Sequence, residues 1–238
     1  MAFPKHFKVK IYVDSADAAL IDKYAPESYV SGFTTNPTLM KTAGVQDYAA
    51  FAKTLISKIP DRPISFEVFS DELPEMQRQA FEIAHWGKNA YVKIPVTNSR
   101  GETTTPVIKA LSAEGVRLNV TALLTFEQLV GVHKALNPEV PSVLSVFAGR
   151  IADTGRDAVA IMRQCREYLG HGGKAELLWA SSRELYNLVQ AEEAGADIIT
   201  MSPDLLKKLP MYGMDLTALS LDTVKMFKRD AESAGFQL

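Results

Sequence analysis

Short apolar runs alternate with longer stretches of helical period along the whole chain. The apolar runs are rich in β-branched and aromatic residues and are bounded by turn-forming residues, which is typical of strands. Several of them end in a polar side chain. Strands are expected at 9–13, 28–33, 63–69, 90–97, 116–122, 141–147, 177–181 and 197–201.

The stretches between these runs carry the signals of helices. Phe51, Leu55 and Ile59 follow one another at intervals of four residues, which puts them on one helix face. Thr125 and Gln128 form a capping-box pattern. The helix expected at 70–86 has an acidic start, which suits the positive end of its dipole. Helices are expected at 15–24, 45–59, 70–86, 104–111, from 125 onward, 157–169, 182–194, 204–209 and 220–234.

This alternation predicts an α/β protein. Eight strand–helix units in 238 residues match the size of a (β/α)8 TIM barrel, with the last helix as a C-terminal extension. No linker rich in proline or serine divides the chain, so residues 1–238 are expected to form a single domain. An open doubly wound sheet is the alternative fold, but both its fingerprint G-x-G-x-x-G and the P-loop are absent.

Composition and charge narrow the classes of function. The chain is 47% hydrophobic and 23% charged, which is ordinary for a globular protein. A net charge of −2 gives no reason to expect nucleic acid or an anionic membrane as partner. Cys165 is the single cysteine and residues 1–6 lack the apolar core of a signal peptide, so a cytoplasmic setting is expected. The histidines have no metal-ligand spacing, so no metal is expected.

The strand expected at 90–97 carries a lysine in its middle. Tyr91, Val92 and Ile94 place apolar residues on both faces, as in a strand of a covered parallel sheet. Lys93 would then lie inside the protein. Burial of a lysine favours the neutral amine, which attacks carbonyls and forms the Schiff base of class I aldolases. From this stretch alone, the alternative is a lysine that reaches water from the strand end.

Polar residues recur in the last half of the expected strands. In barrel enzymes the catalytic groups come from the carboxyl ends of several strands. A buried polar group costs free energy unless it is paired, so packing does not explain one such residue in strand after strand. This pattern favours an enzyme. The residues are Asp14, Glu67, Lys93, Asn119, Thr121, Ser145 and Ser181, with Asn36 just after another strand.

Seven short motifs carry these residues, one at each of the first seven expected strands. They are Val13-Asp14-Ser15, Thr34-Thr35-Asn36-Pro37-Thr38, Glu67, Val92-Lys93-Ile94-Pro95, Asn119-Val120-Thr121, Ser145-Val146-Phe147-Ala148-Gly149-Arg150 and Ser181-Ser182-Arg183. In this order they resemble the transaldolases, a family of class I aldolases. The chain is short for the family and resembles its compact bacterial members, which include the fructose-6-phosphate aldolases.

The resemblance implies a role for each side chain, without a cofactor. Lys93 forms the Schiff base with a ketose phosphate, Asp14 is the acid/base, and Glu67 with Thr121 holds a catalytic water. Substrate-binding residues are expected to be Thr34, Asn36, Asn119, Ser145 and Phe147, with Arg150, Ser181 and Arg183 for the phosphate. Without the family, Asn36 could form a turn, Asp14 could cap a helix, and the arginines could be solvated surface charges.

The implied activity is transfer of a dihydroxyacetone unit from a ketose phosphate, such as sedoheptulose 7-phosphate or fructose 6-phosphate, to an aldose phosphate, as in the pentose phosphate pathway. A fructose-6-phosphate aldolase and a sulfonated-sugar transaldolase are alternatives with the same chemistry. An inactive barrel that serves as a scaffold is the alternative from another class. Phe147 favours a transaldolase over an aldolase. The aldolases that resemble this segment have a tyrosine there, whose hydroxyl can protonate the enamine and release dihydroxyacetone, and phenylalanine has no such proton.

Two further features leave alternatives open. Trp179 could narrow the pocket or face the helices. Compact relatives often form rings through the C-terminal helix, so a homo-oligomer such as a pentamer or decamer is expected. The apolar residues Leu221, Val224 and Phe227 could contact a neighbouring copy or pack on their own barrel.

Overall fold

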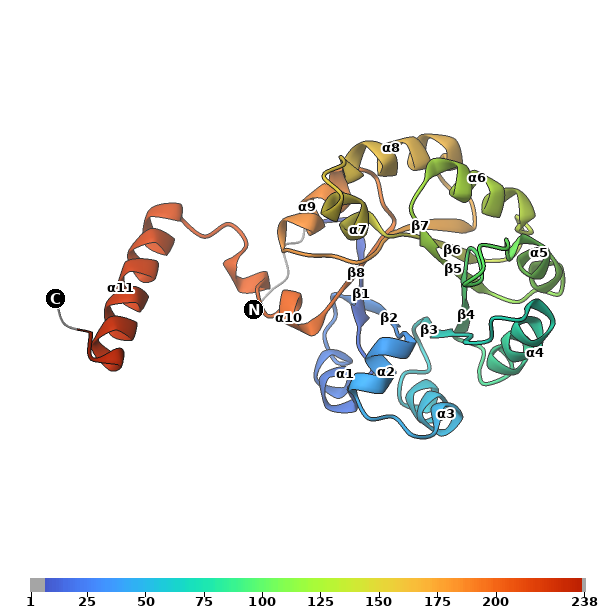
Figure 1. The fold of residues 1–238 in the computed structure, drawn as a ribbon, viewed down its shortest axis with the longest axis horizontal. Helices are drawn as coiled ribbons and strands as arrows, with labels where there is room; N and C mark the ends of the chain where they lie inside the picture. The colour runs from blue at the N-terminus through green and yellow to red at the C-terminus, as the bar shows by residue number, and fades with distance from the viewer. Residues whose placement is uncertain (1–6, 237–238) are drawn as a thin grey trace.

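The computed structural model describes residues 7–236 of the chain. Within that range, eight parallel strands pair in chain order and the last pairs with the first, so the sheet is a closed barrel. Helices surround this barrel (Figure 1). The predicted (β/α)8 fold with a C-terminal helix extension is therefore confirmed. Residues 1–6, in which no signal peptide is expected, lie outside the described residues.

Each expected strand is present, with bounds that shift by a few residues. The strands are β1 (Lys10–Asp14), β2 (Val30–Thr34), β3 (Ile64–Glu67), β4 (Ala90–Pro95), β5 (Leu118–Leu123), β6 (Ser142–Val146), β7 (Ala175–Trp179) and β8 (Ile198–Met201). The register aligns Lys93 of β4 with Glu67 on one neighbouring strand and with Asn119 on the other. Three residues predicted for the site therefore lie side by side across adjacent strands.

The helices begin, in several cases, at a side chain that accepts a hydrogen bond from the first turn. Asp17, Asp47 and Asp157 do so, and Thr125 with Gln128 makes the predicted capping box. The helices are α1 (Ala18–Tyr24), α2 (Pro37–Thr42), α3 (Tyr48–Lys58), α4 (Leu73–Ala84), α5 (Thr105–Ala113), α6 (Phe126–Ala135), α7 (Ala148–Asp153), α8 (Ala158–Leu169), α9 (Tyr186–Glu193), α10 (Pro203–Leu206), the 3₁₀ helix η1 (Leu209–Met211) and α11 (Leu216–Ala234).

Apolar side chains form two layers around the sheet. On its outer face, residues such as Val92 and Ile94 pack under the helices and are fully buried. A smaller cluster fills the inside of the barrel, and it consists of Tyr12, Tyr91, Val143, Leu178, Ala180 and Ile198. Tyr91 and Lys93 are two positions apart on β4, so they point to the same face. The inside of the barrel is therefore apolar at one level and polar at the next level toward the strand ends.

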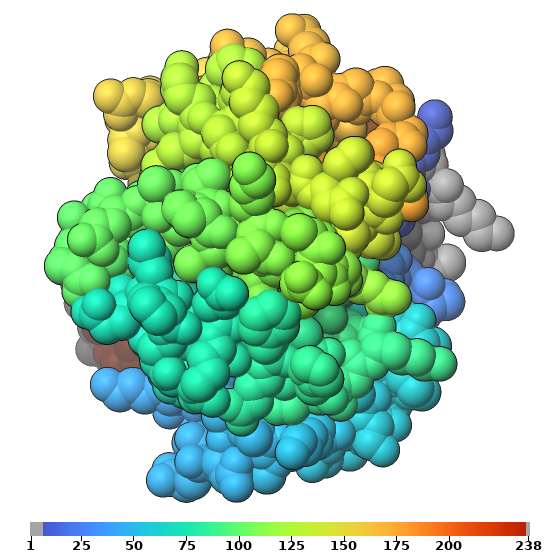
Figure 2. Space-filling view, turned by 90° about the vertical axis from the view of Figure 1, so that its right-hand side faces the viewer, coloured from blue at the N-terminus to red at the C-terminus, as the bar shows by residue number. Residues whose placement is uncertain are grey.

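The helices cover the strands from outside. Figure 2 shows a continuous surface on the side of the molecule that carries α4, α5 and α6 (teal to yellow-green). On this side α4 packs on β4, and α5 lies between α4 and α6. The strand of Lys93 is thus enclosed on both faces, as its apolar residues predict. Among residues 7–236, the helices are too short or too polar to span a bilayer.

Two short helices occupy segments in which no helix was predicted. The first, α2, follows β2 directly, because Asn36 accepts a hydrogen bond from the N–H of Leu39 and Pro37 takes the first helical position. The second, α7, follows β6 and begins after Phe147. Both short helices therefore begin at the rim of the barrel, immediately after residues predicted for the site.

The helices expected after β7 and β8 also differ from the sequence prediction. The helix expected at 182–194 begins only at Tyr186, because the side chain of Asn187 accepts hydrogen bonds from the N–H groups of Arg183 and Glu184. The helix expected at 204–209 is divided into α10 and η1, since Pro210 has no N–H to continue a helix. The C-terminal helix begins at Leu216, with Asp215 as its cap.

The loop after β7 passes very close to α7. The N–H of Gly149 donates to the carbonyl of Ala180 at 3.3 Å. A Cβ atom at position 149 would lie only 1.7 Å from the carbonyl oxygen of Ser181. Ser181 itself has a φ of 62°, in the left-handed region that non-glycine residues rarely adopt. Glycine at 149 thus allows the loop to hold Ser181 beside the helix that carries Arg150.

We expect Gly149→Ala to lower the free energy of unfolding by roughly 1–3 kcal/mol, the usual cost of overpacking, since backbone must move. Gly131→Ala is the matched control. Gly131 lies within α6, and apart from its chain neighbours and the nearby backbone of this helix, no described atom is within 4 Å of the added carbon. This change should therefore stabilise the protein by about 0.5–1 kcal/mol. Urea titration measures both. Equal stability of the two variants would contradict the close approach at Gly149.

Candidate active site

A cavity opens at the carboxyl ends of the strands, where most of the predicted site residues meet. The predicted residues that line it are Asp14, Thr34, Asn36, Lys93, Asn119, Thr121, Ser145, Phe147, Arg150 and Ser181. Glu67 and Arg183 were predicted for the site but are not part of this lining. Leu178, Ala180 and Thr200 line the cavity and were not predicted.

Lys93 is buried within this cavity. Val92 and Ile94 on the same strand point to the helices, so the alternation of β4 turns Lys93 into the barrel. Its side chain is only 9% exposed. The Nζ atom donates to the carbonyl oxygen of Thr35 at 3.1 Å and lies 3.1 Å from Oε2 of Glu67. The alternative of a lysine that reaches out to water is therefore wrong.

Glu67 contacts Lys93 from the neighbouring strand. It is the last residue of β3 and pairs in register with Lys93. Glu67 also lines a second, more apolar cavity between α2 and α3, whose walls include Pro37, Met40, Tyr48 and Phe69. Glu67 thus lies between the two cavities, and its carboxylate contacts the amine of Lys93 from the neighbouring strand β3.

Asp14 is held by a short chain of hydroxyl groups. The hydroxyl of Thr34 donates to Oδ1 of Asp14 at 2.7 Å and lies 2.6 Å from the hydroxyl of Thr200. Since Thr34 has one proton to donate, Thr200 must be the donor of the second bond whenever Asp14 is ionised. Burial raises the pKa of Asp14, while the charge of Lys93 and the Thr34 bond oppose this shift. Thr200 gives β8 a polar residue at the same level, which the alternation of that strand could have revealed.

Asn119 is fixed by bonds at both ends of its amide group. The hydroxyl of Ser145 donates to Oδ1 of Asn119 at 2.6 Å, and Nδ2 of Asn119 donates to the hydroxyl of Ser65 at 2.9 Å. These bonds connect β6, β5 and β3 across the interior of the barrel. Ser65, which is buried on β3, was not predicted for the site. The side chains of Asn119 and Ser145 are therefore held in place by hydrogen bonds before a ligand binds.

Thr121 lies at an irregularity in β5. The pairing of β5 with β6 shifts between Val120 and Leu123, and Ala122 has a φ of 61°. Such bulges are frequent beside active sites, where they redirect a side chain. The hydroxyl of Thr121 is buried and has no hydrogen-bond partner within residues 7–236. A water molecule in the cavity would satisfy it.

Phe147 and Arg150 form one side of the cavity mouth. Phe147 is half-buried and packs against the apolar cluster inside the barrel. The guanidinium of Arg150 lies over the Phe147 ring, 5.6 Å from its centre. Ser181, which Gly149 allows to come close, lines the same cavity. A positive charge is thus located at the mouth, on the side of β6 and β7.

Arg183 and Trp179 do not line this cavity. The guanidinium of Arg183 forms an ion pair with Asp153 of α7, and its side chain is half exposed. Phosphate binding by Arg183 stays a prediction. Trp179 is 1% exposed and packs in the outer layer under the helices. Of the two alternatives for Trp179, the structure supports a core residue.

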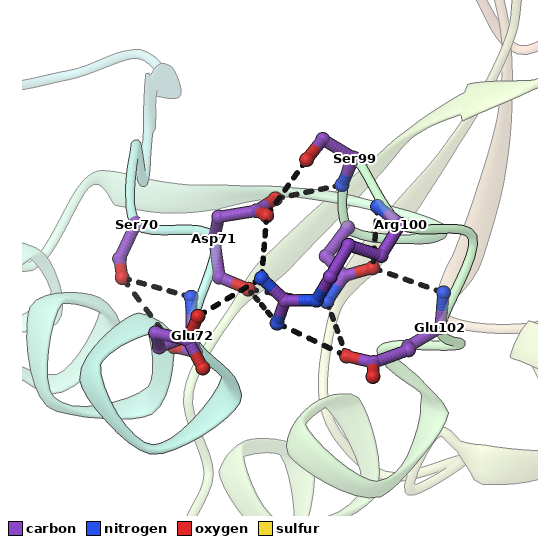
Figure 3. Close-up of polar contacts among 7 residues, drawn as sticks. Ser70, Asp71, Glu72, Ser99, Arg100 and Glu102 are labelled. Carbon is purple, nitrogen blue, oxygen red and sulfur yellow. Dashed lines mark hydrogen bonds and ion pairs between the residues drawn. The ribbon is translucent and has the colours of Figure 1, made fainter.

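A network of charges joins the loop after β3 to the loop after β4, the strand that carries Lys93 (Figure 3). The N–H and the hydroxyl of Ser99 donate to Asp71 at 2.6 and 2.7 Å, and these bonds lower the pKa of Asp71. Arg100 pairs with Asp71, Glu72 and Glu102. Asp71 and Glu72, from the acidic start expected for the helix at 70–86, thus lie before α4 and bind Arg100 of the loop after β4. Glu72 caps α4 without a side-chain hydrogen bond.

Metal ligands do not gather in the described part of the chain. No group of three or more His, Cys, Asp or Glu side chains there could hold a metal ion. The polar groups of the cavity are instead an amine, a carboxylate, a guanidinium, hydroxyls and amides. This set can exchange protons and hold a polyhydroxylated ligand.

Solved structures with a similar fold are barrels of remote sequence. A 2,3-dimethylmalate lyase matches with a TM-score of 0.56 and 14% identity, over 98% of this chain and 85% of its own. A 3-hexulose-6-phosphate synthase from Salmonella typhimurium matches with a TM-score of 0.56 and 13% identity, over 82% of this chain and 89% of its own. Identities this low support the fold alone.

Closer relatives are similar in sequence over most of their length. A probable transaldolase of Dehalococcoides mccartyi is 32% identical over 206 residues, which are 86% of this chain and 91% of the relative. A probable transaldolase of Lactiplantibacillus plantarum is 34% identical over 218 residues, 90% and 96% of the two chains. The family model described as transaldolase/fructose-6-phosphate aldolase matches residues 11–238. The chain therefore belongs to the transaldolase/fructose-6-phosphate aldolase family.

Proposed function

We propose that this protein is a transaldolase that works through a Schiff base on Lys93. The observation that carries the proposal is the buried amine of Lys93, 3.1 Å from the Glu67 carboxylate, in a cavity that Asp14 also lines. The proposed donor is a ketose phosphate such as sedoheptulose 7-phosphate or fructose 6-phosphate, and the acceptor is an aldose phosphate, as in the pentose phosphate pathway. The buried Cys165, alone in the sequence, suits the reduced cytoplasm where this pathway runs.

The first half of the proposed reaction makes an iminium. The amine of Lys93 attacks the C2 carbonyl, a C–N bond forms, and the resulting carbinolamine loses its hydroxyl as water. The nitrogen must give up a proton and the leaving hydroxyl must gain one. Glu67 beside Nζ suits this exchange, and the unpartnered hydroxyl of Thr121 suits a water that carries the proton.

The second half cleaves the C3–C4 bond. The iminium accepts the electron pair of that bond, Asp14 takes the proton of the C4 hydroxyl, and an aldehyde leaves. Three carbons stay on Lys93 as an enamine, and an acceptor aldehyde reverses these steps. The raised pKa of Asp14, caused by burial, makes its carboxylate a stronger base than an aspartate in water. Thr34, Asn36, Asn119 and Ser145 offer hydroxyl and amide groups to the sugar.

The phosphate is proposed to bind at the cavity mouth. Arg150 and Ser181 line it, and the planar guanidinium of an arginine can hold two phosphate oxygens at once. Arg183, which pairs with Asp153, is proposed to contact the phosphate from the next loop. A sulfonate has similar oxygens, so a sulfonated sugar is the alternative substrate at the same position.

Phe147 favours transfer over simple aldol cleavage. It lines the cavity, and a phenylalanine has no hydroxyl with which to protonate the enamine carbon. The three-carbon unit would then stay on Lys93 until an aldehyde arrives. A fructose-6-phosphate aldolase, which releases free dihydroxyacetone, is the alternative. The intact set of Lys93, Glu67 and Asp14 disfavours an inactive scaffold barrel.

Borohydride treatment in the presence of fructose 6-phosphate tests the Schiff base. Wild type should gain the mass of one reduced adduct per chain, and Lys93→Ala should lose both the adduct and turnover. Lys41→Ala is the matched control, because this lysine lines the neighbouring cavity and should keep the adduct. Intact-mass spectrometry measures the adduct in wild type and in both variants. An adduct that persists in Lys93→Ala would assign the chemistry to another lysine.

The fate of the enamine tests transfer against aldol cleavage. With fructose 6-phosphate alone, wild type should release free dihydroxyacetone far more slowly than it turns over with erythrose 4-phosphate as acceptor. Phe147→Tyr should release it faster, because the new hydroxyl can donate a proton. Enzymatic assay of dihydroxyacetone measures both rates. If wild type releases it as fast as it transfers, the aldolase alternative replaces this proposal.

The C-terminal helix is proposed to dock on a second copy of the chain. Figure 1 shows α11 standing apart from the barrel, and none of its described residues is buried. Leu221, Val224 and Phe227 are 54%, 60% and 61% exposed, so they do not pack on their own barrel. An exposed apolar stripe of this kind marks an interaction surface, and a ring such as a pentamer or decamer would cover it.

Sedimentation velocity tests this assembly. Wild type should sediment well above the 26.2 kDa of one chain. A Leu221→Glu/Phe227→Glu variant should dissociate, because two charges enter an apolar contact. Arg229→Glu is the control, since this residue lies on the polar side of the same helix and should leave the assembly intact. Wild type that sediments as a single chain would contradict the proposal.

A further inference from the structure

The carbonyl group of Glu67 lacks a partner in the sheet. On this side of β3, the last ladder bond runs from the N–H of Thr35 to the carbonyl of Ser65, at 3.1 Å. Carbonyl groups alternate along a strand, so the carbonyl of Glu67 points toward β2, as that of Ser65 does. The N–H that would continue this ladder belongs to position 37, which is Pro37. Proline has no N–H, and here the chain leaves the sheet as α2. The Glu67 carbonyl therefore needs a donor from elsewhere.

Tyr48 supplies this donor. It is the first residue of α3, and its hydroxyl donates to the carbonyl of Glu67 at 2.9 Å. Burial raises the pKa of Tyr48, so the hydroxyl keeps its proton across the physiological range. A side chain from outside the barrel thus replaces the missing bond of the sheet.

The ring of Tyr48 is itself fixed by aromatic contacts. It meets Phe66, Phe69 and Trp86 edge to face, with ring centres 6.4, 5.8 and 5.5 Å away. Phe66 and Phe69 flank position 67 in the chain. The ring and hydroxyl of Tyr48 therefore hold the end of β3 from the same side.

We propose that Tyr48 is a positioning residue, whose hydroxyl holds the backbone of Glu67 so that the carboxylate stays in contact with the amine of Lys93. This inference rests on the proposed Schiff-base function. The carboxylate depends on that backbone because Glu67 is the last residue of its strand and lies between two cavities. Small displacements of a catalytic group are costly, about 10²-fold for 1 Å.

Tyr48→Phe removes the hydroxyl and keeps the ring. The rate of adduct formation with fructose 6-phosphate, quenched by borohydride, should fall roughly 10- to 100-fold, while KM for the sugar changes less than about twofold. Tyr24→Phe is the matched control. It breaks another tyrosine-to-carbonyl bond, from Tyr24 to Pro203 at 3.2 Å, and should leave the adduct rate unchanged. An equal loss in both variants would mean a general effect on stability and would overturn the proposal.

A double-mutant cycle separates positioning from structure. In a Glu67→Gln background, Tyr48→Phe should cause little further loss, because both changes act on the same group. The same loss in both backgrounds would overturn the proposal. If Tyr48→Phe does not fold, Phe69→Leu replaces it, since Phe69 is 67% exposed. Phe69→Leu loosens the packing of the Tyr48 ring and should also slow adduct formation. An unchanged rate in this variant would count against the inference.

The outcomes also separate this inference from the proposed function. If wild type forms no adduct at all, the Schiff base on Lys93 is wrong and the Tyr48 inference falls with it. If wild type forms the adduct and Tyr48→Phe forms it at the same rate, the Schiff base stands and only the positioning role is wrong.

Discussion

The contact between Lys93 and Glu67 is the interaction on which the rest of the site depends. A buried charge is strongly destabilising when it is alone and is tolerated when it is paired with good geometry. The parallel register of β3 and β4 aligns the two residues, and the Thr35 carbonyl gives the amine a further partner. An amine can therefore be kept inside an apolar barrel, near the level where the strands end and a ligand can reach it.

The other polar residues of the cavity satisfy one another in the same way. Asp14 is bonded to Thr34, and Asn119 lies between Ser145 and Ser65. These bonds bring together strands that are far apart in the sequence, and they fix side chains before any ligand binds. Prearranged polar groups of this kind stabilise developing charge without the cost of reorganisation. The hydroxyl of Thr121 lacks such a partner within the described residues, which makes it the natural position for a water.

Irregular backbone gathers at the carboxyl ends of the strands. β2 leaves the sheet at Asn36 to begin α2, β5 has a bulge at Ala122, and Ser181 takes a left-handed conformation against Gly149. Each departure frees or redirects groups that a regular strand would use in its ladder. The donor that Tyr48 provides to Glu67 compensates for one of them. The rim of the barrel can hold a site because its strands stop being regular there.

The sequence alone determined the eight-strand plan and most of the cavity. Periods of two and of about four residues are local properties, so they reveal strands, helices and inward-facing residues such as Asp14, Lys93 and Asn119. The alternation of β8 could also have revealed Thr200, but the partner that a side chain meets on a distant segment could not be read in this way. Thr200 and Ser65 join the site through partners on other strands, Arg183 turns to Asp153, and Trp179 faces the helices. Only the tertiary structure decided these partners, because closure of the barrel, and not spacing along the chain, sets which side chains meet.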